Sequence, residues 1–148
     1  EQSGETGKTQ DVGAEGGGVD MAESIKAAVG LKEKGNAAFV EGKVAEAMAL
    51  YTQAYQTVSE VEPDTEEHMH ERAHVQMACL INKAQAASTL GEYQDAFSCC
   101  SLALEIDPRN VRAYHRRAVA LQGMNEIESA RQDLEAVLYL DPTHLEAQ

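Results

Sequence analysis

The sequence has few aromatic residues and no tryptophan. Only 5% of its 148 residues are aromatic, although 43% are hydrophobic. The cores of β-sandwiches draw on aromatic and β-branched side chains, whereas an alanine-rich composition suits closely packed helices. We therefore predict an all-α fold, and the length fits one domain.

Long apolar segments are also missing. No run approaches the ~18–20 residues that cross a membrane as a helix, and no basic segment followed by an apolar stretch opens the chain as a secretory signal would. The chain lacks an initiating Met and stops near the expected start of a helix. We therefore expect a piece of a longer protein without a membrane span.

The residues needed for metal binding or catalysis are sparse. Cys79, Cys99 and Cys100 are an odd number of cysteines without metal-ligand spacing, and we expect them to be thiols in a reducing compartment. His70 and His74 have the spacing of helix-borne zinc ligands, but no convincing third ligand accompanies them. There is also no Gly-rich phosphate loop or nucleophile elbow. We expect no metal, no cofactor and no enzymatic activity in this fragment.

Net charge excludes a further class of partner. The formal charge of −13 argues against general nucleic-acid binding. The acidic residues are unevenly spread, however, because residues 108–125 contain no Asp or Glu. The same segment carries four arginines, namely Arg109, Arg112, Arg116 and Arg117. A basic segment in an acidic chain indicates a local anionic ligand.

Glycine is concentrated at one end. Residues 1–19 hold six of the eleven glycines, together with Ser, Thr, Gln and acidic residues. Such a segment buries too little apolar surface to fold. We expect 1–19 to be a flexible tail or linker, and 20–148 to be the folded domain.

The rest of the chain is repetitive. Ile106-Asp107-Pro108 recurs as Leu140-Asp141-Pro142, 34 residues later, and Gly42 aligns with Gly91 after allowing for a 15-residue insertion. A 34-residue period is that of the tetratricopeptide repeat (TPR), a helix pair that stacks into a right-handed superhelical solenoid. We predict three repeats at about 22–61, 64–107 and 109–142, with a truncated capping helix from 143. The expected helices are 20–40, 44–61, 65–90, 93–106, 111–124 and 127–140, the inserted residues lengthening the second and third.

Small and large residues recur within the repeats. The expected small contacts between helices are Ala47, Ala54, Ala96, Ala103 and Ala130. The larger side chains expected to fill the space between these contacts are Tyr51, Tyr93, Ile127 and Leu134.

Polar donors recur on the first helix of each predicted repeat, which lines the concave side of such a solenoid. Lys32 and Asn36 share one helix face, as do Arg112 and Arg116. Asn82 lies 34 residues before Arg116, in the equivalent place of its own repeat. Ammonium, amide and guanidinium groups in one row suit carboxylate ligands.

Three segments resemble the carboxylate-clamp TPR domains of co-chaperones, such as the TPR immunophilins (FK506-binding-protein-like) and the Hsp-organising protein. The matching segments are Leu31-Lys32-Glu33-Lys34-Gly35-Asn36, Leu80-Ile81-Asn82-Lys83-Ala84 and 110–118. The resemblance implies a cytoplasmic adaptor that binds the C-terminal Glu-Glu-Val-Asp tail of the seventy- and ninety-kilodalton heat-shock chaperones.

The resemblance also assigns roles to single residues. It places the clamp on Lys32, Asn36, Asn82, Arg112 and Arg116, with Arg112 where the family usually has Lys. Phe39 would wall an apolar pocket. We expect the chain end to be held by Lys32, Asn36, Asn82 and Arg116, and an upstream carboxylate or carbonyl to be held by Arg112. Arg109 and Arg117 are expected to serve solubility or the groove rim.

Other readings stay open at this point. The longer protein could carry a catalytic domain such as a peptidyl-prolyl isomerase. The repeats could then be a regulatory or scaffold domain that binds a different partner or its own chain. We expect this fragment to be monomeric.

Overall fold

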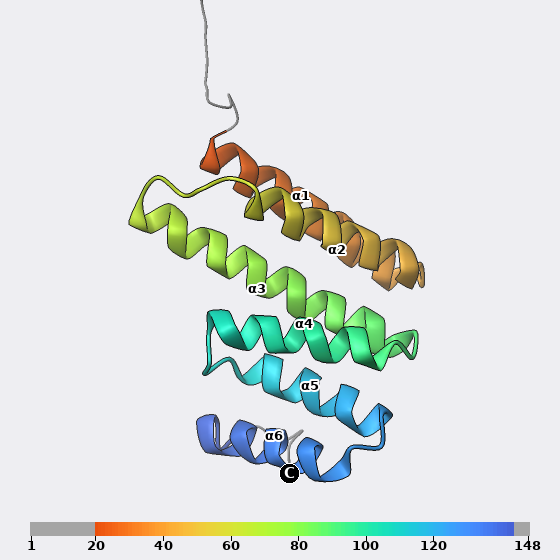
Figure 1. Ribbon diagram of the computed structural model, residues 1–148. Helices are drawn as coiled ribbons and strands as arrows, with labels where there is room; N and C mark the ends of the chain where they lie inside the picture. Colours follow the sequence, from red (N-terminus) through yellow and green to blue (C-terminus); the bar gives the residue numbers. More distant parts are fainter. Residues whose placement is uncertain (1–19, 144–148) are drawn as a thin grey trace, which may run out of the picture.

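The computed structural model describes residues 20–143, and within that range it contains helices and no strand (Figure 1). The helices are α1 (Met21–Val40), α2 (Val44–Ser59), α3 (Glu66–Thr89), α4 (Tyr93–Ile106), α5 (Val111–Gly123) and α6 (Ile127–Leu140). The predicted all-α fold is confirmed. The predicted tail 1–19 and all but the first residue of the capping helix predicted from 143 lie outside the described residues.

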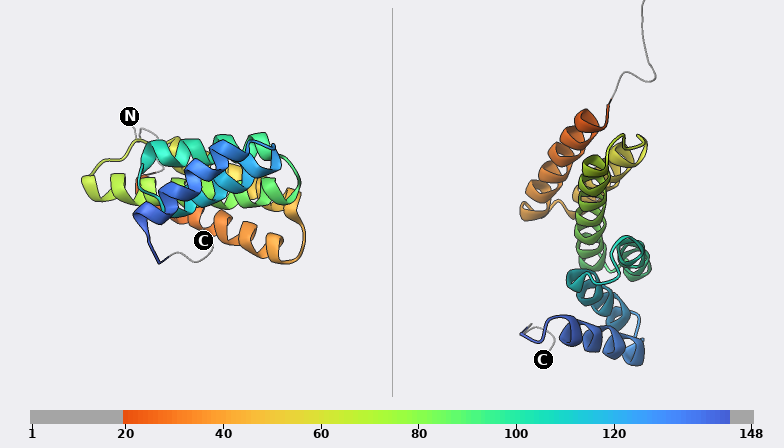
Figure 2. Two further views of the ribbon diagram at one scale, coloured as in Figure 1. Left: turned by 90° about the horizontal axis from the view of Figure 1, so that it is seen from below. Right: turned by 90° about the vertical axis from the view of Figure 1, so that its left-hand side faces the viewer.

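Consecutive helices pack as pairs, and the pairs stack in chain order from α1 to α6 (Figure 1). The first helices of the pairs also touch one another, α1 with α3 and α3 with α5. The right-hand view of Figure 2 shows that successive pairs are rotated along the stack. Side chains on α1, α3 and α5 can therefore meet although they are far apart in sequence.

The turn inside each helix pair has the same backbone conformation. Gly42, Gly91 and Asn125 occupy equivalent places and have φ values of +86°, +79° and +62°. This left-handed region favours Gly and tolerates Asn. In each turn the next backbone N–H donates to the carbonyl five residues before it, at 2.8 Å in all three. Satisfying these helix-end carbonyls fixes where the second helix departs.

Alanine provides the close helix contacts, as predicted. All five expected small residues are buried: Ala47, Ala54, Ala96, Ala103 and Ala130. Among the expected fillers, Tyr51 is buried, and Tyr93 and Leu134 are half-buried. The prediction for Ile127 is wrong, because this side chain is 59% exposed. Ile127 is the first residue of α6, and α6 packs chiefly against α5, so its first turn lacks a cover among residues 20–143.

The inserted residues lengthen α3 most. This helix has 24 residues, whereas α5 has 13. Its cap is Thr65, whose hydroxyl accepts from the backbone N–H of His68 at 3.0 Å. The neighbouring Asp64 instead contacts the imidazole of His68.

Within the described residues no helix is both long and apolar enough to cross a membrane.

Candidate ligand-binding groove

The three first helices enclose a hollow of about 300 Å³. Its lining comes from α1, α3, the cap of α5 and α5 itself: Lys32, His74, Met77, Ala78, Ile81, Asn82, Asn110 and Arg112. Lys32, Asn82 and Arg112 were predicted from sequence to lie together, and they do.

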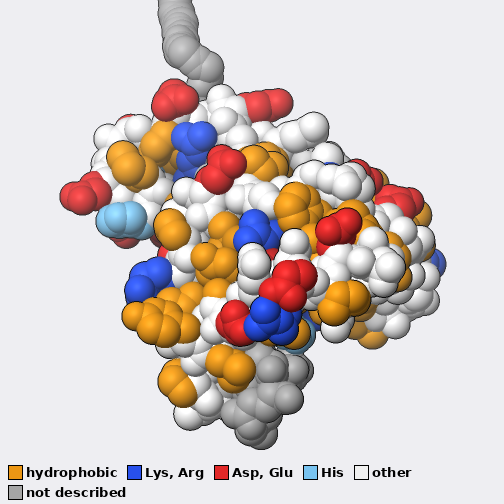
Figure 3. All heavy atoms as spheres, turned by 60° about the horizontal axis from the view of Figure 1, so that its bottom comes forward, with side chains coloured by type: hydrophobic (Ala, Val, Ile, Leu, Met, Phe, Trp, Pro, Cys, Tyr) orange, Lys and Arg blue, Asp and Glu red, His pale blue; other side chains and the backbone are white. Residues whose placement is uncertain are grey.

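On the face shown in Figure 3, acidic and basic side chains are interspersed, so the overall charge of −13 does not form one extended acidic patch there.

A chain of hydrogen bonds crosses four helices at this groove. The Tyr51 hydroxyl donates to Asn36 Oδ1 at 2.5 Å. The Asn82 amide nitrogen donates to the same oxygen at 3.3 Å. Arg112 Nη2 donates to Asn82 Oδ1 at 3.4 Å. Asn36 is therefore brought into contact with Asn82, and Asn82 with Arg112.

The direction of this chain follows from chemistry. A guanidinium group only donates, so Asn82 must turn its oxygen towards Arg112 and its nitrogen towards Asn36. Asn36 must then present its own oxygen to Asn82 and Tyr51. Both amide oxygens are turned towards donors within the protein. What remains for a ligand is the Asn36 NH₂ group, further N–H groups of Asn82 and Arg112, and the Lys32 ammonium group. The site offers donors and positive charge, the features that bind an anion.

Lys32 is half-buried on α1 and faces α3. Its charge reaches the thiol of Cys79. Burial raises the pKa of Cys79 to about 11, and the nearby Lys32 charge acts in the opposite direction. Burial likewise raises the pKa of Cys100 to about 12. Cys79, Cys99 and Cys100 are buried free thiols and stay protonated near neutral pH.

Arg116 and Phe39 do not line this hollow. Arg116 is one turn beyond Arg112 and lines a separate hollow of about 250 Å³ with Gln85, Ser88, Thr89 and Val119. Phe39 is half-buried and packs against a cluster that includes Ala38, Tyr51 and Ala86. Among the predicted site residues, Asn36, Asn82 and Arg112 are therefore linked by hydrogen bonds. Lys32 shares the hollow with Asn82 and Arg112, whereas Arg116 and Phe39 lie further along their helices.

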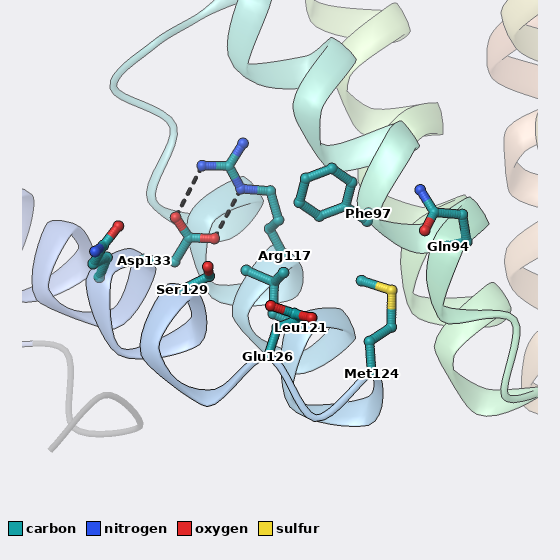
Figure 4. Close-up of a pocket in the computed structure, with 9 residues that line it drawn as sticks. Gln94, Phe97, Arg117, Leu121, Met124, Glu126, Ser129 and Asp133 are labelled. Atoms are coloured by element: carbon teal, nitrogen blue, oxygen red, sulfur yellow. Dashed lines mark hydrogen bonds and ion pairs between the residues drawn. The ribbon is translucent and has the colours of Figure 1, made fainter.

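The prediction that Arg117 serves solubility or the groove rim is wrong. Its guanidinium makes two hydrogen bonds with Asp133 of α6, at 2.8 and 2.9 Å (Figure 4). It also donates a hydrogen bond to the hydroxyl of Ser101 at 3.3 Å. It also lies over the rings of Phe97 and Tyr114, at 5.6 and 5.7 Å from their centroids. Arg116 and Arg117 diverge because consecutive side chains on a helix point about 100° apart.

The Arg117–Asp133 pair lines a hollow of about 490 Å³, together with Phe97, Leu121 and Met124 (Figure 4). Asp133 is 6% exposed. Its carboxylate neutralises Arg117, so the pair leaves this hollow without a free positive charge. The hollow therefore lacks the donor character of the groove.

His74, Met77 and Asn110 line the groove but were not predicted. The spacing of His74, Ala78 and Asn82 by four residues places them on one face of α3 and could have revealed His74. The side-chain oxygen of Asn110 already has a partner, because it accepts a hydrogen bond from the backbone N–H of Ala113 at 2.9 Å and so caps α5. No group of three His, Cys, Asp or Glu residues among 20–143 could hold a metal ion.

The fold has counterparts among known proteins. The tetratricopeptide repeat family model matches residues 78–110 and 111–144. Mouse RNA polymerase II-associated protein 3 is 34% identical over 125 residues, which cover 84% of this chain and 16% of the relative. The chain therefore spans only about a sixth of that relative's length.

Two solved structures are similar throughout the stack. The C-terminal TPR-containing domain of a Plasmodium falciparum FK506-binding protein has a TM-score of 0.79 at 25% identity, covering 88% of this chain and 87% of that one. The first TPR domain of Spaghetti (RPAP3), solved with the HSP90 peptide SRMEEVD, has a TM-score of 0.66 at 32% identity, covering 81% and 83%. With helix pairs, turns and relatives in agreement, this chain belongs to the tetratricopeptide repeat family.

Proposed function

We propose that this groove binds the acidic C-terminal end of a partner polypeptide, specifically the Glu-Glu-Val-Asp tail of the seventy- and ninety-kilodalton heat-shock chaperones. The observation that carries the proposal is the hydrogen-bond chain, which turns the oxygens of Asn36 and Asn82 towards donors of the protein and leaves N–H donors for the ligand. A free chain end beside an aspartate side chain presents two carboxylates within a few ångströms. Capture of a C-terminal carboxylate by clustered donors is a known mode of peptide recognition.

The contacts support a particular division of roles. Asn36, Asn82 and Arg112 are linked by hydrogen bonds, and Lys32 lines the same hollow as Asn82 and Arg112. We therefore assign the terminal carboxylate and the last aspartate to these four residues. Arg116, in the neighbouring hollow, is then placed for an upstream carboxylate or carbonyl. This exchanges the roles of Arg112 and Arg116 relative to the expectation from sequence. We place Phe39 against an apolar side chain of the peptide.

The first TPR domain of Spaghetti (RPAP3), which is similar to this chain, was solved with the HSP90 peptide SRMEEVD. This similarity supports the same class of ligand for the groove. We propose that residues 20–148 act as a cytosolic co-chaperone adaptor, joined through 1–19 to the rest of a longer protein. A peptidyl-prolyl isomerase domain is our candidate for that remainder.

Calorimetric titration tests the proposal with two peptides, SRMEEVD and the same peptide amidated at its C-terminus. The unmodified peptide should bind, and amidation should abolish or strongly weaken binding because it removes one anion. Equal affinity for both peptides would exclude recognition of the chain end.

Two variants separate the roles of the arginines. A charge-assisted hydrogen bond contributes about 1.5–3 kcal/mol, so Arg112→Ala should weaken binding of the unmodified peptide by about 10- to 100-fold and reduce the difference between the peptides. Arg116→Ala should weaken both peptides while preserving their ratio. Arg131→Ala is the control, since Arg131 pairs with Glu128 and Glu135 on α6. Unchanged affinity in Arg112→Ala would remove Arg112 from the site.

A further inference from the structure

We propose that Tyr51 is a positioning residue for this groove, whose hydroxyl fixes the Asn36 amide with its NH₂ group towards the ligand. This inference rests on the proposed function. Tyr51 belongs to α2, a second helix of a pair, whereas the groove lining comes from first helices and the cap of α5. Its contribution would be to make the site selective for an anion at the chain end.

The geometry holds the Tyr51 hydroxyl in place. The residue is 3% exposed and packs among Ala38, Ala47 and Ala86. Its ring lies against the backbone of Gly35, where an added Cβ would come within 2.7 Å of the ring. The absence of a side chain at Gly35 therefore lets the ring approach α1 directly beneath Asn36. From there the hydroxyl reaches Asn36 Oδ1 at 2.5 Å.

An exposed asparagine needs such a constraint. The amide of Asn36 lies on the surface and carries an acceptor on one side and two donors on the other. Turned by half a rotation, it would point its oxygen at the ligand carboxylate and repel it. Asn82 also donates to Asn36 Oδ1, but at the longer distance of 3.3 Å. The Tyr51 hydroxyl is thus the closer of the two donors that set the orientation.

The state of the hydroxyl is consistent with this role. Burial raises the pKa of Tyr51 above its ordinary value, so the phenol stays protonated and can donate throughout the neutral range. A buried tyrosine hydroxyl usually finds a hydrogen-bond partner. Here the partner is Asn36 on α1, which is hydrogen-bonded to the groove residue Asn82.

Tyr51→Phe tests the inference because it keeps the ring and removes only the hydroxyl. SRMEEVD should bind about three- to ten-fold more weakly, as expected for one hydrogen bond of ordinary strength. The amidated peptide should change less, so the affinity ratio of the two peptides should fall. A residue that merely fills the core would leave that ratio unchanged. Tyr55→Phe is the matched control, as Tyr55 is half-buried on the same helix and packs against two core clusters.

A second readout does not need the peptide. Nitrogen-15 relaxation of the Asn36 side-chain amide in the free protein should show a well-ordered group, and its order should drop in Tyr51→Phe but not in Tyr55→Phe. Unchanged amide order or an unchanged peptide ratio in Tyr51→Phe would overturn the inference. If the unmodified chain binds neither peptide but the order of the Asn36 amide still falls in Tyr51→Phe, the proposed function fails and the positioning role of Tyr51 stands.

Discussion

At the scale of single residues, side-chain role depends on helix face more than on residue type. Arg112, Arg116 and Arg117 come from one basic segment of α5. Arg112 joins the groove, Arg116 lines a neighbouring hollow, and Arg117 turns to Asp133 on α6. A net positive segment is therefore divided between two surface hollows and internal packing.

The Arg117–Asp133 pair yields a stability prediction. Asp133→Ala should lower the free energy of unfolding by about 2–3 kcal/mol, since it leaves the Arg117 charge unpaired in a mostly buried place. This is less than the ~3–5 kcal/mol of a fully buried pair, because the Arg117 side chain keeps 24% of its exposure. Urea denaturation measures the loss.

Glu135→Ala is the matched control, on the same helix. Glu135 pairs with Arg131 at an exposed position, where an ion pair contributes little. Its urea midpoint should stay close to that of the unmodified chain. Equal losses in both variants would contradict a special role for Asp133.

At the scale of elements, each first helix begins with a side-chain cap and each second helix follows a tight turn without one. Asp20, Thr65 and Asn110 cap α1, α3 and α5, whereas α2, α4 and α6 lack a side-chain cap bond. The caps and turns are local in sequence. This is why the helix starts of α2, α4, α5 and α6 could be predicted to the residue.

The start of α3 should respond to pH. The hydrogen bond with Asp64 raises the pKa of His68, and the same contact lowers the pKa of Asp64. The His68 contribution to stability is present below the ordinary imidazole pKa and is lost as pH rises through the raised value. The Asp64 contribution is present above the ordinary carboxyl pKa and is lost as pH falls through the lowered value. The pair therefore supports α3 in the mildly acidic range between these limits.

NMR titration of the His68 ring protons checks this. In the unmodified chain His68 should titrate above the ordinary histidine range, and in Asp64→Asn its midpoint should shift down. Identical midpoints in the two proteins would mean that Asp64 and His68 do not interact in solution.

At the scale of the whole molecule, an acidic chain is proposed to bind an acidic peptide. The net charge of −13 would repel such a ligand at long range. Lys32 and Arg112 both line the groove, so a carboxylate bound there would lie close to two positive charges, and attraction at short range outweighs a repulsion spread over the surface.

Salt should therefore weaken binding. Raising sodium chloride from 0.1 M to 1 M shortens the screening length from about 10 Å to about 3 Å, which removes both the distant repulsion and part of the local attraction. Calorimetry with SRMEEVD should show falling affinity because the local contacts dominate. Rising affinity would show that net repulsion controls the encounter.

The sequence by itself determined the helices, their turns and the three-fold repetition, because caps, left-handed Gly or Asn residues and alanine spacing act within a few residues of one another. The four-residue spacing of polar side chains also indicated that the candidate donors share one face of each first helix. Only the tertiary structure decided which donors meet. The stacking offset between α1, α3 and α5 joins Asn36 to Asn82 and Asn82 to Arg112 while Arg116 stays in the next hollow. The approach of α2 to Gly35 likewise brings Tyr51 to Asn36. Such contacts depend on how rigid helices rotate against each other, and that rotation is set by the whole packed interface.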